Sequence, residues 1–174
     1  IPFVTERTSV YLPVEVDGAF LYLGDCHAIQ AYGELGGIAM ECSADVQIRV
    51  SRCRPNSGWF EEDRYVDEQK YSPPIIITGD EPLTEKNGIA IVGVSPDFGC
   101  LDKAVVDSYR SSVKFIRQIC PRVSLGGARN LLTLLGHSLN GQAASKTAEA
   151  TSLIFFKEQD LAKIYRSTTE DILY

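Results

Sequence analysis

The sequence predicts an α+β fold, in which a β-rich, sandwich-like N-terminal part is followed by two or more helices packed with further strands. Two observations lead to this prediction. Apolar residues alternate with other residues through much of the N-terminal part, as in half-buried strands, whereas from Leu101 they recur at helical spacing. The 174 residues suit one domain, with residues 1–53 as the β-rich part, residues 54–73 as a polar excursion and residues 74–174 as the α+β part.

The β-rich part opens with a predicted hairpin. Residues 9–16 and 19–23 have the pattern of strands, and Asp17-Gly18 between them is a strong hairpin signal. Because Pro13 has no N–H to donate, we expect the first strand to be an edge or bulged strand. The remaining segments of this part are a glycine-rich loop and two further strands, at residues 24–37, 38–42 and 45–50.

Helices and strands are mixed in the rest of the chain. Apolar residues at helical spacing predict a helix that begins at Leu101 and that Pro121 terminates. Residues 128–135 are typical of a second, more buried helix. The other predicted elements are two buried strands, a late strand and a short helix, at residues 75–77, 89–92, 148–156 and 159–164.

The composition argues against several classes of protein. Lys plus Arg is 17 and Asp plus Glu is 23, and the resulting net charge of −6 disfavours a nucleic-acid binder. No apolar run approaches the roughly 20 residues of a membrane helix, and the first residues lack the pattern of a signal peptide. The five cysteines form no Cys-x-x-Cys pair, which favours reduced thiols in the cytoplasm. Since the chain begins at Ile1, we expect a processed product, a fragment or a trimmed chain.

A serine-hydrolase motif is present only in part. Residues 136–141, Gly-His-Ser-Leu-Asn-Gly, resemble the Gly-x-Ser-x-Gly elbow, but Asn140 occupies the second glycine position. The run before the motif is helical rather than β, and no histidine follows His137 to serve as the base. We therefore do not expect a catalytic triad within this chain.

The residues that carry chemistry lie in and just after the glycine-rich loop. Asp25 and His27 are two positions apart, so an extended segment places both side chains on one side. Glu34 follows the turn that Gly33 permits and can fold back toward them. Asp, His and Glu are ligands of zinc and similar divalent ions. Glu41, on the following strand, is suited to act as a general base or to hold a substrate amine.

A simpler interpretation of these residues stays open. Asp-x-His in a loop is also typical of a turn-capping Asp beside an ordinary His. Cys26 points away from Asp25 and His27 in an extended segment, which favours packing over a ligand role. A Cys26–His27 nucleophile pair is weak, because sequence neighbours rarely bring base and nucleophile within hydrogen-bond reach.

This stretch resembles the signature of the acetamidase/formamidase family, Gly-Asp-x-His-x-x-Gln-Gly-Asp-Gly-Glu followed by a further Glu. The matching positions are Gly24, Asp25, His27, Gln30, Gly33, Glu34 and Glu41. Residues 11–20 resemble the Leu-Pro-Val…Gly-Ala run that precedes the signature. Three later segments also resemble the family. Residues 94–113 are similar to its helix entry, residues 128–144 to its leucine-rich run and residues 152–161 to its terminal strand.

The chain departs from the family pattern in three places. The Gly-Asp before Gly-Glu is replaced by Ala31-Tyr32, which removes a carboxylate and adds a ring that either narrows the pocket or lies at the surface. His137 stands where the family has Asp, and Leu139 where it has Arg. If those acids bind metal or orient the amide, the departures imply a different substrate, a different metal or none.

The resemblance implies metal-assisted hydrolysis of a short linear amide, such as formamide or acetamide, to a carboxylate and ammonia. The residues assigned on this basis are Glu41, Glu34 and Gln30 for catalysis, Tyr32, Gly33 and His137 for substrate binding, and Asp25, His27 and Glu34 for a divalent ion, zinc foremost. The alternative is a catalytically inactive relative that acts as a binding or structural subunit.

The resemblance also bears on partners, because it covers nearly the whole chain but only the C-terminal half or so of a family member. We expect a homo-oligomer, or a second chain that supplies the N-terminal half, since open strand edges invite pairing. We expect a small amide substrate, no nucleic acid, no membrane and a cytoplasmic location.

Overall fold

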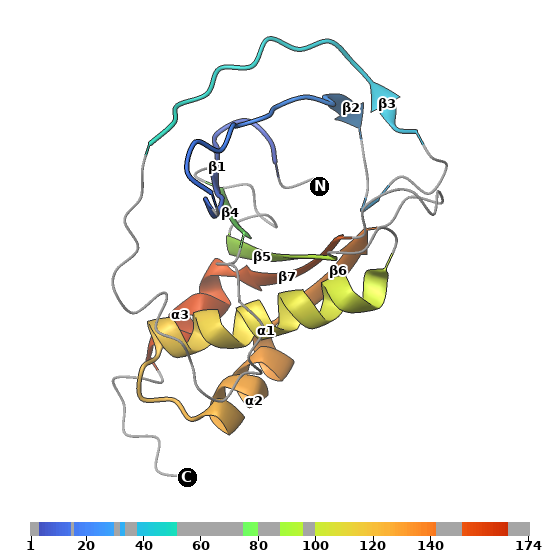
Figure 1. The fold of residues 1–174 in the computed structure, drawn as a ribbon. Helices are drawn as coiled ribbons and strands as arrows, with labels where there is room; N and C mark the ends of the chain where they lie inside the picture. The colour runs from blue at the N-terminus through green and yellow to red at the C-terminus, as the bar shows by residue number, and fades with distance from the viewer. Residues whose placement is uncertain are drawn as a thin grey trace.

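A computed structural model describes residues 4–14, 16–29, 32–33, 38–51, 75–79, 88–95, 100–141 and 151–166 (Figure 1). Its elements are β1 (Thr8–Tyr11), β2 (His27–Ile29), β3 (Met40–Glu41), β4 (Ile75–Gly79), β5 (Gly88–Val94), α1 (Leu101–Ile119), α2 (Leu125–Leu135), β6 (His137–Gly141), β7 (Thr151–Lys157) and α3 (Glu158–Arg166). Five strands form an antiparallel sheet in the order β1-β4-β5-β7-β6, and β2 and β3 form a separate two-stranded ribbon. The predicted α+β class is confirmed.

Strands β5 and β7 form the centre of the sheet and are buried on both faces. Ile91 pairs with Ile154, and the alternation of side chains along each strand then divides the core into two clusters. One cluster contains Ile91, Ile154 and Phe156 and meets the helices, whereas Val92 and Phe155 belong to the other. Because both faces are covered, these strands are continuous apolar runs rather than alternating ones.

Helices α1 and α2 cover one face of the sheet, and α2 lies beyond α1 as seen from the strands (Figure 1). Ile116 and Phe115 of α1 are buried, and the Phe115 ring lies 6.0 Å from the ring of Phe156 on β7. From α2, Leu132 completes this cluster. Among the described helices, none combines the length and the apolar character that crossing a membrane requires.

The contact between α1 and the sheet is unusually close at Gly93. A Cβ atom built on Gly93 would lie 2.2 Å from the backbone nitrogen of Ser108 and 2.3 Å from the carbonyl oxygen of Ala104. Small side chains line the rest of this contact. The hydroxyl of Ser108 lies 3.0 Å from that of Ser152 on β7 and also donates to the carbonyl of Val105. The helix therefore approaches the strands at a distance that only glycine permits.

Asp107 on α1 adds a polar link at the same end of β5. Its carboxylate accepts a hydrogen bond from the backbone N–H of Val94 at 3.0 Å. Burial raises the pKa of Asp107 above the ordinary carboxyl value, and the bond from Val94 and the charges of Arg110 and Lys114 oppose that rise. The net effect is a carboxyl group that is harder to ionise in the folded chain than in the unfolded chain.

The predicted N-terminal hairpin is wrong, although its turn is present. Gly18 has a φ of 76°, and the N–H of Ala19 donates to the carbonyl of Val16. The return segment at residues 19–23 forms no strand, and β1 pairs with β4 instead. Pro13 gives the physical reason, since it cannot donate to a ladder that would continue β1 toward the turn.

Other element predictions fare differently. The helix predicted from Leu101 is confirmed. The second helix begins three residues earlier than predicted. The hydroxyl of Ser124 caps its start by accepting a hydrogen bond from the N–H of Gly127 at 3.0 Å. The glycine-rich loop contains strand β2, and the strand expected at residues 45–50 is absent. The polar excursion predicted at residues 54–73 lies outside the described residues.

Replacing Gly93 with Ala tests the close contact of α1 with the sheet. The new methyl group would overlap backbone atoms of Ala104 and Ser108, which cannot rotate away. We expect a loss of about 3 kcal/mol in the free energy of unfolding, measured by urea denaturation. Gly126→Ala is the matched control, because α2 leaves open space at Gly126, and alanine there should be stabilising by about 0.5–1 kcal/mol. Equal effects of the two substitutions would contradict this account of Gly93.

Asp107→Asn tests the pH dependence of stability. The folded chain binds the Asp107 proton more tightly than the unfolded chain, because its pKa is raised. The tighter proton binding therefore stabilises the folded chain below the ordinary carboxyl pKa, and this stabilisation is lost as the pH rises through the raised pKa of Asp107. Asparagine can still accept from Val94 but carries no charge, so the variant should gain stability relative to the wild type as the pH rises from 3.5 to 7. Urea denaturation across that range measures the difference, with Asp45→Asn as an exposed control. A constant difference would refute the assignment.

Candidate metal centre

The β2–β3 ribbon brings two distant segments of the N-terminal part together. The backbone N–H of Cys42 donates to the carbonyl of Cys26 at 3.1 Å, which makes these residues a hydrogen-bonded pair. His27 and Glu41 form the next pair of the ladder, which is of the non-hydrogen-bonded type. Side chains of such pairs lie closer together than those of hydrogen-bonded pairs. The register thus fixes the Glu41 carboxylate beside the His27 imidazole.

Asp25 reaches the same imidazole from two residues before β2. Its φ is 59°, in the left-handed region that Asp tolerates better than most residues. The sequence predicted that Asp25 and His27 share a side because the segment is extended. The two side chains do meet, but through this local reversal of the backbone rather than through an extended segment.

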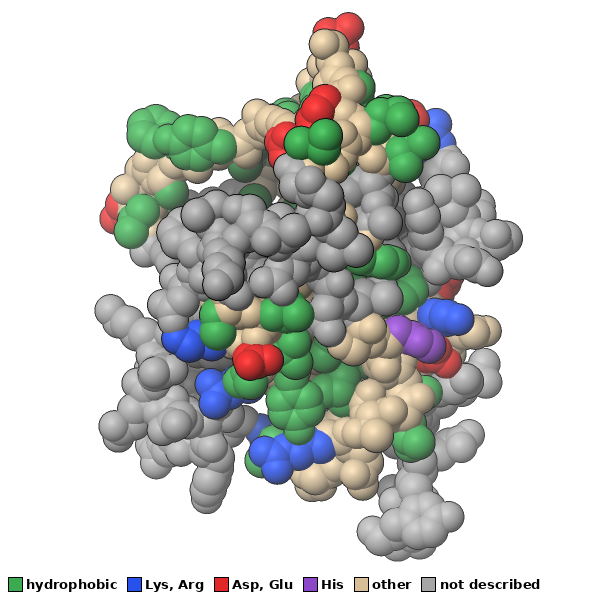
Figure 2. Space-filling model, turned by 90° about the vertical axis from the view of Figure 1, so that its right-hand side faces the viewer, with side chains coloured by type: hydrophobic (Ala, Val, Ile, Leu, Met, Phe, Trp, Pro, Cys, Tyr) green, Lys and Arg blue, Asp and Glu red, His purple; other side chains and the backbone are tan. Residues whose placement is uncertain are grey.

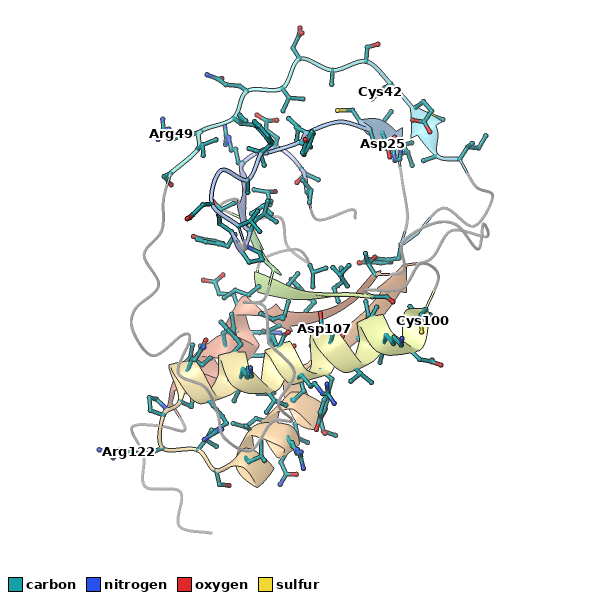
Figure 3. The ribbon with its side chains drawn as sticks, in the orientation of Figure 1. Asp25, Cys42, Arg49, Cys100, Asp107 and Arg122 are labelled. Carbon is teal, nitrogen blue, oxygen red and sulfur yellow. The ribbon has the colours of Figure 1, made fainter. Side chains whose placement is uncertain are left out.

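Three ligand atoms converge at this point. His27 Nε2 lies 3.1 Å from Asp25 Oδ1 and 3.1 Å from Glu41 Oε2, and all three atoms lie within 4.8 Å of one another. The His27 side chain is 7% exposed, whereas those of Asp25 and Glu41 are 79% and 60% exposed. Figure 3 shows Asp25 beside this ribbon, across the main sheet from α2. The cluster therefore has a buried imidazole and two carboxylates that face solvent.

The donor set fits a divalent cation. Zinc binds imidazole nitrogen and carboxylate oxygen at about 2.0–2.2 Å, so ligand atoms around a tetrahedral ion lie about 3.3 Å apart. Both separations from His27 Nε2 are near that value. A protonated His27 between two carboxylates is the metal-free alternative, but Nε2 then has one hydrogen for two acceptors. A cation satisfies all three groups at once.

The other predicted site residues are placed differently. Glu34 and Gln30 lie outside the described residues. Gly33 has a φ of 87°, as its predicted turn requires, and Tyr32 beside it is exposed. His137 lies in β6 of the main sheet rather than on the ribbon, with its Nε2 4.0 Å from Asp160 Oδ2 of α3 (Figure 1). The described part of the chain therefore does not bring His137 to the cluster.

Glu41 is the residue whose contact with His27 the sequence did not indicate. We predicted a base or amine-binding role for Glu41 and a ligand role for Glu34, whereas Glu41 is the residue that lies beside His27. The sequence did place Glu41 on a predicted strand, where its side chain alternates with that of Met40. It did not indicate how this strand pairs with β2, because that pairing joins residues that the glycine-rich loop separates.

The order of elements around the serine motif is the reverse of that in a nucleophile elbow. Ser138 lies in β6, which follows helix α2, whereas the elbow requires a strand before the serine and a helix after it. The only described acid near His137 is Asp160, at 4.0 Å. Nothing in the described geometry favours serine catalysis.

Comparison with known proteins gives one result. The model of the acetamidase/formamidase family matches residues 1–111, which include the whole β2–β3 ribbon and more than half of α1. No curated protein and no solved structure gives a significant match. The match covers more than half of the chain, and it agrees with the resemblance carried by Gly24, Asp25 and His27. The chain belongs to the acetamidase/formamidase family.

Proposed function

We propose that this chain hydrolyses a short linear amide, such as formamide or acetamide, to a carboxylate and ammonia with the help of a divalent ion. Membership of the acetamidase/formamidase family supports amide hydrolysis as the reaction class. The convergence of Asp25, His27 and Glu41 at one point is the observation that carries the proposal. Apart from this cluster, the described residues offer no such group of three ligands.

In this proposal Asp25, His27 and Glu41 hold the ion, for which zinc is the first candidate because it accepts imidazole and carboxylate ligands. Three protein ligands leave a position for water or substrate. When bound, a divalent ion polarises a carbonyl group and lowers the pKa of water, which provides a nucleophile at neutral pH. His27 contributes Nε2, so its remaining proton resides on Nδ1.

The exposure of the two carboxylates supports access for a small substrate. Asp25 and Glu41 are mostly exposed, while the nearly buried ring of His27 keeps its orientation. Glu34 retains its predicted place among the catalytic and metal-binding residues, and Gln30 its predicted role in hydrogen bonding to the amide. Tyr32 and Gly33 remain the predicted substrate contacts, and His137 is the weakest of the set because it pairs with Asp160.

A catalytically inactive relative remains the second candidate. Two observations favour it: Ala31-Tyr32 departs from the family signature, and His137, which replaces a family acid, is paired within the main sheet and α3. In that case the His27 ion pairs with Asp25 and Glu41 would fasten the ribbon without a metal. Metal content and ammonia release separate the two candidates.

We also propose that further strands from another chain, either a second copy or a separate chain of the same family, cover the N-terminal segments. Large apolar side chains are exposed on these segments, and Figure 2 shows hydrophobic side chains gathered at that end of the molecule. They include Val14, Phe20, Tyr22, Val46, Ile48 and Val50. The rings of Phe20 and Tyr22 contact each other edge-on while both remain exposed. Exposed apolar groups of this number are typical of an interface.

Metal analysis beside an amide-hydrolysis assay tests the proposed function. We expect one divalent ion per chain and ammonia release from formamide or acetamide. His27→Ala should abolish both, while Asp25→Asn and Glu41→Gln should each weaken metal affinity at least about tenfold. Asp45→Asn is the matched control, since its carboxylate lies on the segment after β3 but outside the cluster.

Three results discriminate among the candidates. An ion retained by His27→Ala would show that the metal lies elsewhere. A bound ion without ammonia release from any small amide would favour the inactive relative. A wild-type chain that binds no divalent ion would refute the metal centre.

Light scattering tests the proposed interface. The purified chain should show a mass that rises with concentration, and Phe20→Asp should lower that mass because the new charge opposes burial of the apolar surface. Leu134→Asp is the control, since Leu134 is a similarly exposed apolar residue on α2. A monomer at all concentrations would contradict self-association, and an equal effect of both substitutions would show that the interface is not specific to the N-terminal segments.

A further inference from the structure

Two cysteines face each other across the β2–β3 ribbon. Cys26 directly precedes β2 and Cys42 directly follows β3. The backbone N–H of Cys42 donates to the carbonyl of Cys26 at 3.1 Å, and the Cys42 thiol donates to the same oxygen at 3.4 Å. The sulfur of Cys42 is therefore directed toward Cys26.

The backbone geometry of this pair is compatible with a disulfide bond. Opposed residues of a hydrogen-bonded antiparallel pair have Cα atoms about 5.5 Å apart, and disulfides accept Cα separations of about 4.4–6.8 Å. The Cβ atoms of a hydrogen-bonded pair lie about 5.5 Å apart, beyond the roughly 3.5–4.5 Å that a disulfide spans, so the two strands must draw together for the bond to form. A bond here would therefore carry some strain, and strained, exposed disulfides are the readily reduced ones.

The remaining described cysteines lie elsewhere. Cys100 and Cys120 flank the two ends of α1, and Figure 3 shows Cys100 and Cys42 on separate parts of the molecule. Cys120 is buried, and burial raises the pKa of its thiol, which lowers its reactivity. Cys42 is exposed and Cys26 is half-buried, so an oxidant reaches the ribbon pair first.

We propose that Cys26 and Cys42 form a reversible disulfide that locks the register of the β2–β3 ribbon. Glutathione disulfide is the class of oxidant that suits this pair. The Cys42 thiolate attacks it and releases one glutathione thiolate, and the Cys26 thiolate then attacks the Cys42 sulfur and releases the second. Two protein thiols are oxidised and one glutathione disulfide is reduced, and the two protons lost by the thiols pass to the glutathione thiolates or the buffer.

The proposed disulfide lies on the face of the ribbon opposite to the candidate metal centre and affects it through the backbone. Side chains alternate along a strand, so Cys26 and Cys42 lie on one face while His27 and Glu41 lie on the other. A two-stranded ribbon of three and two residues is marginal by itself. The disulfide fixes the Cys26–Cys42 pair, which holds His27 opposite Glu41. This second part of the inference rests on the proposed function, whereas formation of the bond does not.

Peptide mapping of the purified chain tests the bond itself. The chain is equilibrated in glutathione buffers of increasing oxidised fraction, its free thiols are alkylated, and the digested peptides are identified by mass spectrometry. We expect a peptide pair joined through Cys26 and Cys42 that reduction separates. Cys42→Ser should abolish it, and Cys100→Ser should leave it unchanged. Glutathione adducts alone, or Cys42 joined to another cysteine, would overturn the proposal.

Zinc titration against a coloured chelator tests the coupling. The oxidised chain should bind zinc about tenfold more tightly than the reduced chain, the size of effect that support of a ligand's geometry usually has. Cys42→Ser should bind zinc with the same affinity in both buffers. If the disulfide forms and zinc affinity is unchanged, the coupling is refuted while the bond stands. If zinc binds to neither form, the metal centre itself fails.

Discussion

The approach of α1 to the sheet at Gly93 is the constraint on which the folded core depends. No side chain separates β5 from the backbone of Ala104 and Ser108, so the helix axis lies close enough for Phe115 and Ile116 to enter the core. The Ser108–Ser152 contact then ties the same turn of α1 to β7. Helix α2 packs on α1, so its distance from the sheet depends on this contact as well.

The candidate site depends on fewer contacts than the core does, and on different ones. Its geometry comes from one cross-strand pair, His27 with Glu41, and from one left-handed residue, Asp25. None of these residues belongs to the core clusters. The molecule thus combines a well-packed α+β core with a small ribbon that carries the candidate metal centre. Ligands on such a ribbon gain rigidity from whatever fixes its register, whether a bound ion, a covalent link or a neighbouring chain.

The elements that the sequence predicted correctly are those whose signal is local. The spacing of apolar residues after Leu101 sufficed for α1, because one face of that helix is buried along its length. Asp17-Gly18 correctly indicated a turn but not the partner of β1, which is β4. The contact of Glu41 with His27 could not be predicted for the same reason. Strand register joins segments that are distant in sequence, and no local pattern encodes it.

The strand order of the main sheet has a consequence for how the chain is made. Strand β5 lies between β4 and β7, and β7 follows both long helices in the sequence. During synthesis from the N-terminus, the apolar centre of the sheet therefore lacks one neighbour until residue 157 has left the ribosome. Until then, β5 presents an open edge of Ile, Ala and Val. Nascent chains of this protein thus expose that edge while α1, α2 and β6 are being synthesised.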